Sequence, residues 1–390
     1  MCPYGRVFLM SILYGQFLQP SASASLEDCA LSFLPSGLSE GKEVKIAEET
    51  SQKIKNMSLL CAAYVVSIHI GLPGGLDSSS WFVHQVIVDG LARIAVPFFF
   101  VVSGFFLAAH IGESGWWSRE IRKRIPSLVI PFFIWSLLAV LRSVPLRIIA
   151  DLIAHRPFGT SIYMFHDANW LRIAGGDLTD YPILVPLWYV RCLIFFVIAS
   201  PVISFLLSKL GYGWLLLCFA LSIVHSHIPN ADFKDFLSRG FSLSGLFYFS
   251  AGIFLQKHGG FKVSKHTAIV AAIIGTALLA TKITFFYNTW KFQIALGKLS
   301  IPFIMLATWF FMPSKRLPNW ITSCSFPIFL MHVLFFPYIG IALKRLHIGE
   351  GFPTLQPTLN FVVGFFGSII VATLLRRFLP KLSHVLFGGR

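Results

Sequence analysis

The chain has 390 residues, of which 55% are hydrophobic and 40 are phenylalanine, and its mean hydropathy is +0.72. A soluble globule of this size must present a mostly polar exterior, so the composition excludes a soluble protein and predicts an all-α polytopic bundle in a lipid bilayer. The net charge of +15 fits basic residues at cytoplasmic helix ends, and we expect no nucleic-acid partner. The six cysteines show no CxxC or metal-type spacing, so we expect no metal.

The chain begins with an N-terminal extension, residues 1–56, whose polar part we expect to be flexible. A short apolar stretch, Val7–Tyr14, precedes Ala22-Ser23-Ala24 and resembles a cleaved signal sequence. Gly15, Gln16 and Pro20 interrupt that stretch, so an extension without signal function is the alternative. We expect a membrane domain over residues 57–380 and a cytoplasmic tail over 381–390.

The membrane domain contains about ten apolar segments that predict transmembrane helices, each near the length that crosses a bilayer. These segments cover 57–71, 91–111, 126–146, 183–207, 213–229, 241–256, 266–286, 294–312, 321–341 and 355–375. Placing both termini in the cytoplasm gives about twice as many lysines and arginines inside as outside, as the positive-inside rule requires. The loop 147–182 is then external, and its aromatic residues are candidates for stacking on sugars.

His69 ends the first predicted span, and an ionisable group at membrane depth indicates a functional site. A histidine exchanges protons near neutral pH, so His69 is a candidate general base. The alternative is a helix-end histidine that bonds to water or to a backbone carbonyl. None of the 17 acidic residues falls within a predicted span, so a carboxylate that orients His69 must come from a loop. The candidates are Asp77, Asp89, Asp177 and Asp180.

Arg93 opens the second span and is either a fixed cation near the mouth of the bundle or an arginine that extends to the lipid headgroups. Ser103 and Gly104 lie in the middle of the same span. A Ser-Gly pair lets a ligand or another helix approach the backbone closely.

A basic cluster follows the second span and contains Arg119, Arg122 and Arg124. Arginine forks suit phosphate oxygens, so the cluster is a candidate phosphate clamp, and a lipid anchor is the alternative. Two later spans also contain polar groups, Trp188-Tyr189-Val190-Arg191 and His332. A buried Arg or His needs partners, so we expect Arg191 and His332 to face the bundle interior.

Five pieces, taken in order, resemble the integral membrane acyltransferase family 3, whose members acylate glycans of bacterial surfaces. They are the span ending in His69, the segment Arg93–Leu107, Arg119-x-x-Arg122, Leu187–Arg191 and Ser325–His332. The resemblance covers residues 55–380. Two positions depart from the family pattern: Ser58 stands where a basic residue is usual, and Phe329 replaces a tyrosine.

The resemblance implies an O-acyltransferase of the cytoplasmic (inner) membrane that takes an acyl group, most often acetyl, from acyl-CoA. It implies a carbohydrate acceptor at the outer face and leaves room for glycan-assembly partners. His69, Arg93 and Arg191 would be catalytic, the last two as oxyanion-stabilising cations. Donor binding would fall to Ser103, Gly104, Arg119, Arg122 and Arg124, and acceptor binding to Trp188, Tyr189 and His332. The competing hypothesis is a transporter of lipid-linked glycans, which the absence of carboxylates within the predicted spans and of inverted repeats disfavours.

Overall fold

The structure is a computed structural model that describes residues 48–70, 78–157, 178–225, 228–285, 290–348 and 354–389. All regular secondary structure within these ranges is helical. The prediction of an all-α bundle is therefore confirmed. The predicted extension falls outside the described ranges up to residue 47, whereas residues 48–56 form the beginning of helix α2.

The N-terminal half of the described chain contains one long continuous helical stretch, α5 to α6, among shorter helices. Its elements are α2 (Glu48–His69), α3 (Ser78–Ile87), η1 (Leu91–Ile94), α4 (Ala95–Ala108), α5 (Trp116–Arg124), η2 (Ile125–Val129), α6 (Ile130–Ile153), α8 (Leu187–Ile198) and α9 (Ser200–Leu210).

The C-terminal half consists mainly of pairs of helices joined by short connections. Its elements are α10 (Tyr212–Val224), α11 (Ala231–Asp235), η5 (Phe236–Gly240), α12 (Leu243–Lys257), α13 (Lys265–Thr284), α14 (Trp290–Phe311), α15 (Asn319–Thr322), α16 (Ser325–Arg345), α17 (Leu355–Val362), η6 (Val363–Gly367), α18 (Ser368–Phe378) and α19 (Pro380–Phe387).

Each of the ten predicted apolar segments coincides with helical structure. By length and hydropathy, six continuous helical stretches in the described chain are able to cross a membrane, and α8 with α9 makes a seventh if that bent pair is one span. The shorter helices α10 and α12 and the more polar α2 do not meet this measure. Ten spans with both termini in the cytoplasm stays a prediction.

The bend of 68° between α8 and α9 has a local cause in Pro201. Proline has no N–H, so the carbonyl of Val197, four residues earlier, loses its helical partner. The Ser200 hydroxyl donates to that carbonyl oxygen at 2.7 Å instead. The predicted span over 183–207 thus consists of two helices that meet at a bend, and whether the pair crosses the membrane once stays a prediction.

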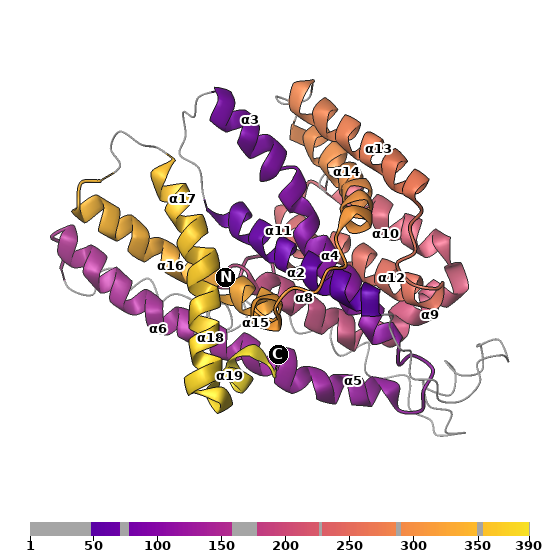
Figure 1. The fold of residues 1–390 in the computed structure, drawn as a ribbon, viewed down its shortest axis with the longest axis horizontal. Coiled ribbons are helices and arrows are strands. Elements are labelled where there is room, and N and C mark those ends of the chain that lie inside the picture. Colours follow the sequence, from indigo (N-terminus) through magenta and orange to yellow (C-terminus); the bar gives the residue numbers. More distant parts are fainter. Residues whose placement is uncertain are drawn as a thin grey trace, which may run out of the picture.

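The helices α4 and α12 form the centre of the bundle and pack along each other (Figure 1). Helices α13 and α14 pack against each other as a pair. Helix α2 lies between α4 and α16 and contacts both, and α16 in turn packs against α17 and α18. Large aromatic side chains fill the centre, and Phe98, Phe100, Phe196 and Phe249 are fully buried.

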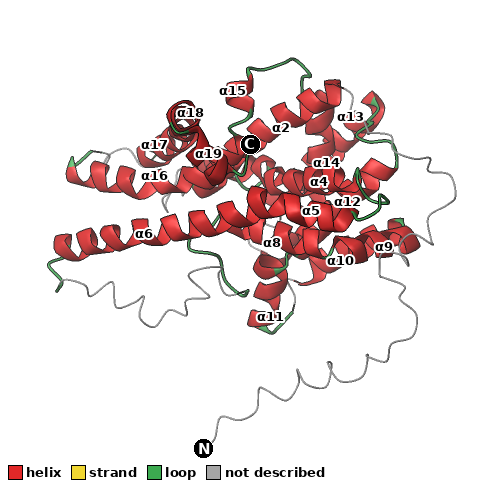
Figure 2. Ribbon diagram, turned by 90° about the horizontal axis from the view of Figure 1, so that it is seen from below, coloured by secondary structure: helices red, strands yellow, loops and turns green. Residues whose placement is uncertain are grey.

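The outer surface of the bundle is apolar where the long helices face outward. On α6, the helix that runs along one edge of the molecule (Figure 2), Phe133, Leu137 and Leu141 are each more than half exposed. Exposed apolar side chains at this density are unfavourable in water and favourable against lipid tails. The surface thus agrees with a multi-pass membrane protein.

Candidate functional site

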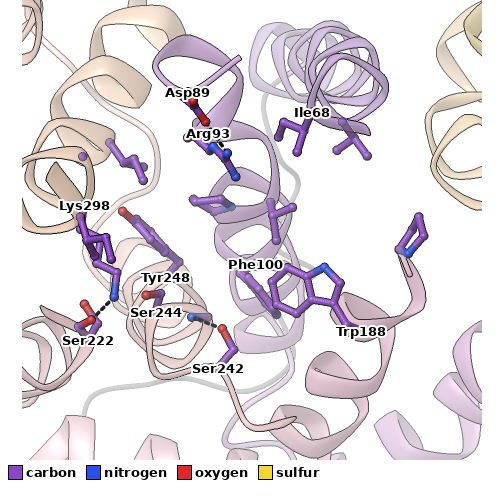
Figure 3. A pocket seen from close by; sticks show the side chains of 18 of the residues that line it. Ile68, Asp89, Arg93, Phe100, Trp188, Ser222, Ser242, Ser244, Tyr248 and Lys298 are labelled. Carbon is purple, nitrogen blue, oxygen red and sulfur yellow. Dashed lines mark hydrogen bonds and ion pairs between the residues drawn. The ribbon is translucent and has the colours of Figure 1, made fainter. Parts of the chain in front are cut away.

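A cavity of about 630 Å³ lies at one end of the bundle. Its wall contains residues from the C-terminal ends of α2, α10 and α13 and from the N-terminal halves of α4, α8, α12, α14 and α16. Consecutive membrane helices run in opposite directions, so these ends share one side of the bundle. Figure 3 shows Lys298 and Tyr248 on one side of the cavity, with Ile68 and Trp188 opposite them.

His69, the last residue of α2, lines this cavity. Its ring lies beside the ring of His332 on α16, with 5.3 Å between the two centroids. The two histidines, predicted separately, are therefore neighbours. The prediction that His332 faces the interior is confirmed, since its side chain is fully buried.

The surroundings of His332 favour one tautomer. Its Nδ1 lies 2.8 Å from the carbonyl oxygen of Ile328, one turn earlier on α16. A carbonyl only accepts, so Nδ1 carries the proton and donates it, which leaves the lone pair on Nε2. Among the described residues this buried Nε2 has no hydrogen-bond partner. His332 thus offers an acceptor nitrogen in the interior next to His69.

Arg93, in η1 just before α4, also lines the cavity. Its guanidinium donates to Asp89 at 2.5 Å, and Nδ1 of His84 lies 3.5 Å from the other oxygen of that carboxylate. Asp89 therefore orients Arg93 rather than His69. Of the other carboxylates considered for His69, Asp180 lies 3.9 Å from the guanidinium of Arg239, while Asp77 and Asp177 lie outside the described residues.

Two lysines in the cavity wall were assigned no role by the sequence. Lys282 on α13 donates to the backbone oxygen of Asp89 at 2.9 Å, and Lys298 on α14 donates to the backbone oxygen of Ser222. The sequence signal was present, because each lysine lies inside an apolar helix. Only the tertiary structure shows that both face the same cavity as His69.

Trp188 lines the cavity, whereas Tyr189 points between helices. The Tyr189 hydroxyl lies 3.2 Å from the Ser103 hydroxyl, and its ring packs on Phe100 with 4.7 Å between centroids. Tyr189 and Ser103 therefore join α8 to α4.

Gly104 lies at the crossing of α4 with α12. A Cβ at this position would overlap the backbone carbonyl of Phe249, and a Cβ at Gly252 on α12 would overlap that of Val101. The side of Gly104 that faces α12 is thus filled by helix backbone. Ser103 therefore contacts Tyr189 on α8, whereas the adjacent Gly104 contacts the backbone of α12.

Arg191 is buried, as predicted, but it does not line the cavity. Its guanidinium donates to the backbone oxygens of Asp180 at 2.9 Å and of Arg239 at 3.0 Å. It therefore fastens the segment before α8 to the turn before α12, both of which contribute residues to the cavity wall.

Helix α5 contains Arg119, Arg122 and Arg124 and follows the other end of α4 from the cavity. The first turns of α4 line the cavity, and the fourteen residues of this helix, roughly 20 Å in length, lead from there toward α5. Glu113 pairs with Arg119 at 2.5 Å, and buried Glu120 pairs with Arg124 at 3.2 Å. The Arg122 side chain is exposed, and with Lys123 four basic residues share this short helix.

Within the described ranges, no group of three or more His, Cys, Asp or Glu side chains is arranged to hold a metal ion. The candidate sugar-stacking residues of the loop 147–182 lie largely outside these ranges, except for Tyr181, which lines the cavity.

Comparisons with known proteins show which family the chain resembles over most of its length. A family profile described as an acyltransferase domain matches residues 54–377, which include both histidines and the basic helix. The chain is also similar to the succinoglycan biosynthesis protein ExoH of Rhizobium meliloti (strain 1021), with 24% identity over 379 residues, 87% of this chain and 92% of that protein. No solved structure matches the chain at a significant level.

Proposed function

The chain belongs to the acyltransferase 3 family, and we propose that it transfers an acyl group, most simply acetyl, from cytoplasmic acyl-CoA to a hydroxyl of an exported or cell-surface polysaccharide. The observation that carries the proposal is His69 in the wall of the cavity, with His332 behind it and Arg93 beside the same space. The biosynthetic role in the name of the similar protein supports a polysaccharide acceptor.

In this proposal His69 is the general base. It takes the proton of the acceptor hydroxyl as the oxygen attacks the carbonyl carbon of the thioester. The new C–O bond forms, the C–S bond breaks, and the proton passes from His69 to the departing CoA thiolate. Arg93, held by Asp89, supplies positive charge for the oxyanion that develops on the carbonyl oxygen.

Donor and acceptor approach from opposite ends of the bundle in this mechanism. The orientation predicted from lysine and arginine counts places the cavity end outside and α5 inside. Arg119, Arg122 and Arg124 would hold the CoA phosphates in the cytoplasm. The pantetheine arm would run along α4 past Ser103. Gly104 would contribute indirectly, because it permits the close crossing of α4 with α12 that shapes this path.

Among the remaining candidates, Trp188 and His332 support the reaction in different ways. Trp188 in the cavity wall offers an aromatic face for a sugar ring. His332 is a positioning residue that packs against His69. Arg191 and Tyr189 would act on the reaction indirectly, since they hold the elements that form the cavity.

The experiment that tests the proposal supplies membranes containing the protein with radiolabelled acetyl-CoA and measures label in polysaccharide. His69→Ala is expected to lower the transfer by roughly 10²- to 10⁴-fold, because a positioned general base contributes on this order. The matched control is His258→Ala at the end of α12, outside the cavity wall, which is expected to retain transfer. Retained transfer in a folded His69→Ala variant would refute the mechanism.

A further inference from the structure

The two cavity lysines are the feature that the proposed reaction does not use. Lys282 lies in the membrane-length helix Lys265–Thr284, and Lys298 lies in Phe292–Phe311. A charged side chain at membrane depth is unfavourable by several kcal/mol unless it faces a polar space or a partner, so such residues mark functional sites. Both side chains face the cavity.

The two ammonium groups approach the cavity from neighbouring helices. A Cβ at Gly297, the residue before Lys298, would lie 3.8 Å from Nζ of Lys282. The side chain of Lys282 therefore crosses from α13 to the face of α14 where Lys298 begins. Figure 3 shows Lys298 directed toward Ser222 at one side of the cavity.

The partners seen in the structure supply these lysines with less negative charge than they carry: Asp89 attracts Lys282 but is shared with Arg93. Each makes its hydrogen bond to a backbone carbonyl oxygen, which accepts a proton but carries no net charge. Among the described residues that line the cavity, Asp89 is the one carboxylate, and it is paired with Arg93. Three cations thus share one anion, an arrangement that suits an anionic ligand.

We propose that the group bound in the cavity carries a carboxylate, which Lys282 and Lys298 hold beside His69. The inference rests on the proposed function and names its substrate class. An acetyl group and a neutral sugar hydroxyl need neither ammonium. A carboxylate on the acyl chain, as in a dicarboxylic half-thioester, or on the sugar, as in a uronic acid, meets both. The hydroxyls of Ser244 and Tyr248 in the same wall add hydrogen-bonding groups for it.

The test measures binding to the purified full-length protein in lipid nanodiscs, without turnover. Two pairs of probes separate the two sources of the carboxylate: succinyl-CoA against acetyl-CoA, and glucuronate against glucose. Dissociation constants come from the change in tryptophan fluorescence, to which Trp188 contributes from the cavity wall. We expect the charged member of at least one pair to bind about tenfold tighter or more, which corresponds to about 1.4 kcal/mol.

Variants assign this preference to the lysines. In Lys298→Gln or Lys282→Gln the preference for the charged probe is expected to fall at least fivefold, and Lys298→Arg is expected to keep it. The matched control is Lys257→Gln, which removes a lysine at the end of α12 that bonds to Ser204 outside the cavity wall. That control is expected to retain the preference.

Two results would overturn the inference: equal binding of charged and neutral members in both pairs by the unaltered protein, or an unchanged preference in both folded lysine-to-glutamine variants. Neither result touches the transfer assay. A protein that transfers label but shows no charge preference disproves this inference alone. A protein that prefers the charged probe but transfers no acyl group disproves the proposed reaction.

Discussion

Buried and partly buried cations in this protein bond to backbone carbonyl oxygens. Arg142, Arg191, Lys282 and Lys298 all do so, at helix ends, turns or proline-interrupted turns. Such carbonyls have lost their helical partner or never had one, and in lipid they find no water. A long basic side chain donates a hydrogen bond to such a carbonyl oxygen, and the carbonyl dipole in turn stabilises the positive charge.

Arg142 illustrates the arrangement at one residue. Pro337 inside α16 has no N–H, so the carbonyl of Val333, four residues earlier, lacks its helical donor. Arg142 on α6 donates to Leu334 at 3.3 Å and to Val333 at 3.5 Å. The guanidinium thereby replaces the hydrogen-bond donor that the proline lacks, and it joins α6 to α16.

Removing this side chain is expected to destabilise the protein. Arg142→Met leaves the Val333 carbonyl without a donor, and we expect it to lower the free energy of unfolding by about 1–3 kcal/mol. Pro337→Ala restores an N–H to α16, so the same Arg142→Met change in that background should have less than half the effect. Thermal unfolding of the four proteins in nanodiscs measures the coupling. Equal losses in both backgrounds would show that Arg142 does not replace the donor that the proline lacks.

At the scale of elements, the crossing of α4 with α12 sets the centre of the bundle. Gly104 and Gly252 let the two backbones meet, since a Cβ at either position would overlap a carbonyl of the other helix. Small residues at the interface replace the hydrophobic driving force that is absent between helices in lipid. The crossing also fixes Phe100 and Tyr248, which line the cavity from the two helices.

We expect Gly104→Ala to force α4 and α12 apart and to lower the free energy of unfolding by about 1–3 kcal/mol, as overpacking does in other cores. The matched control is Gly213→Ala on α10, where an added Cβ meets nothing within 4 Å. Alanine favours a helix over glycine, so the control should not destabilise the protein. Thermal unfolding compares the two, and a Gly104→Ala protein as stable as the control would contradict the close crossing.

At the scale of the whole molecule, hydropathy predicted where the long apolar helices lie, but not the short helices α3, α5, α11 and α19. Backbone groups in lipid must pair within their own segment, so apolar length translates directly into helix. The break at Pro201 was missed because its effect depends on how the chain continues on either side. His69 and His332 were both found, yet their contact joins residues far apart in sequence. The charge of the cavity likewise depends on which helix ends share one side.

The alternation of helix directions shows which connections lie at the same end of the bundle as the cavity. The cavity lies where α10 ends and α12 begins, so the intervening helix α11 belongs to the same end of the bundle. The connection between α14 and α15 belongs to the opposite end. The predicted orientation makes the first external and the second, which contains Lys315 and Arg316, cytoplasmic.

Cysteine labelling tests this orientation directly. Asp232→Cys on α11 and Ser314→Cys between α14 and α15 each place a thiol at an exposed position. Cys61, Cys192, Cys218 and Cys324 are buried and should not react, and Cys2 and Cys29 are replaced by serine in both variants. A membrane-impermeant maleimide applied to intact cells is expected to label the thiol at position 232, and to label position 314 only after permeabilisation. The opposite pattern would place the cavity on the cytoplasmic side, where His69 would meet acyl-CoA but no exported polysaccharide.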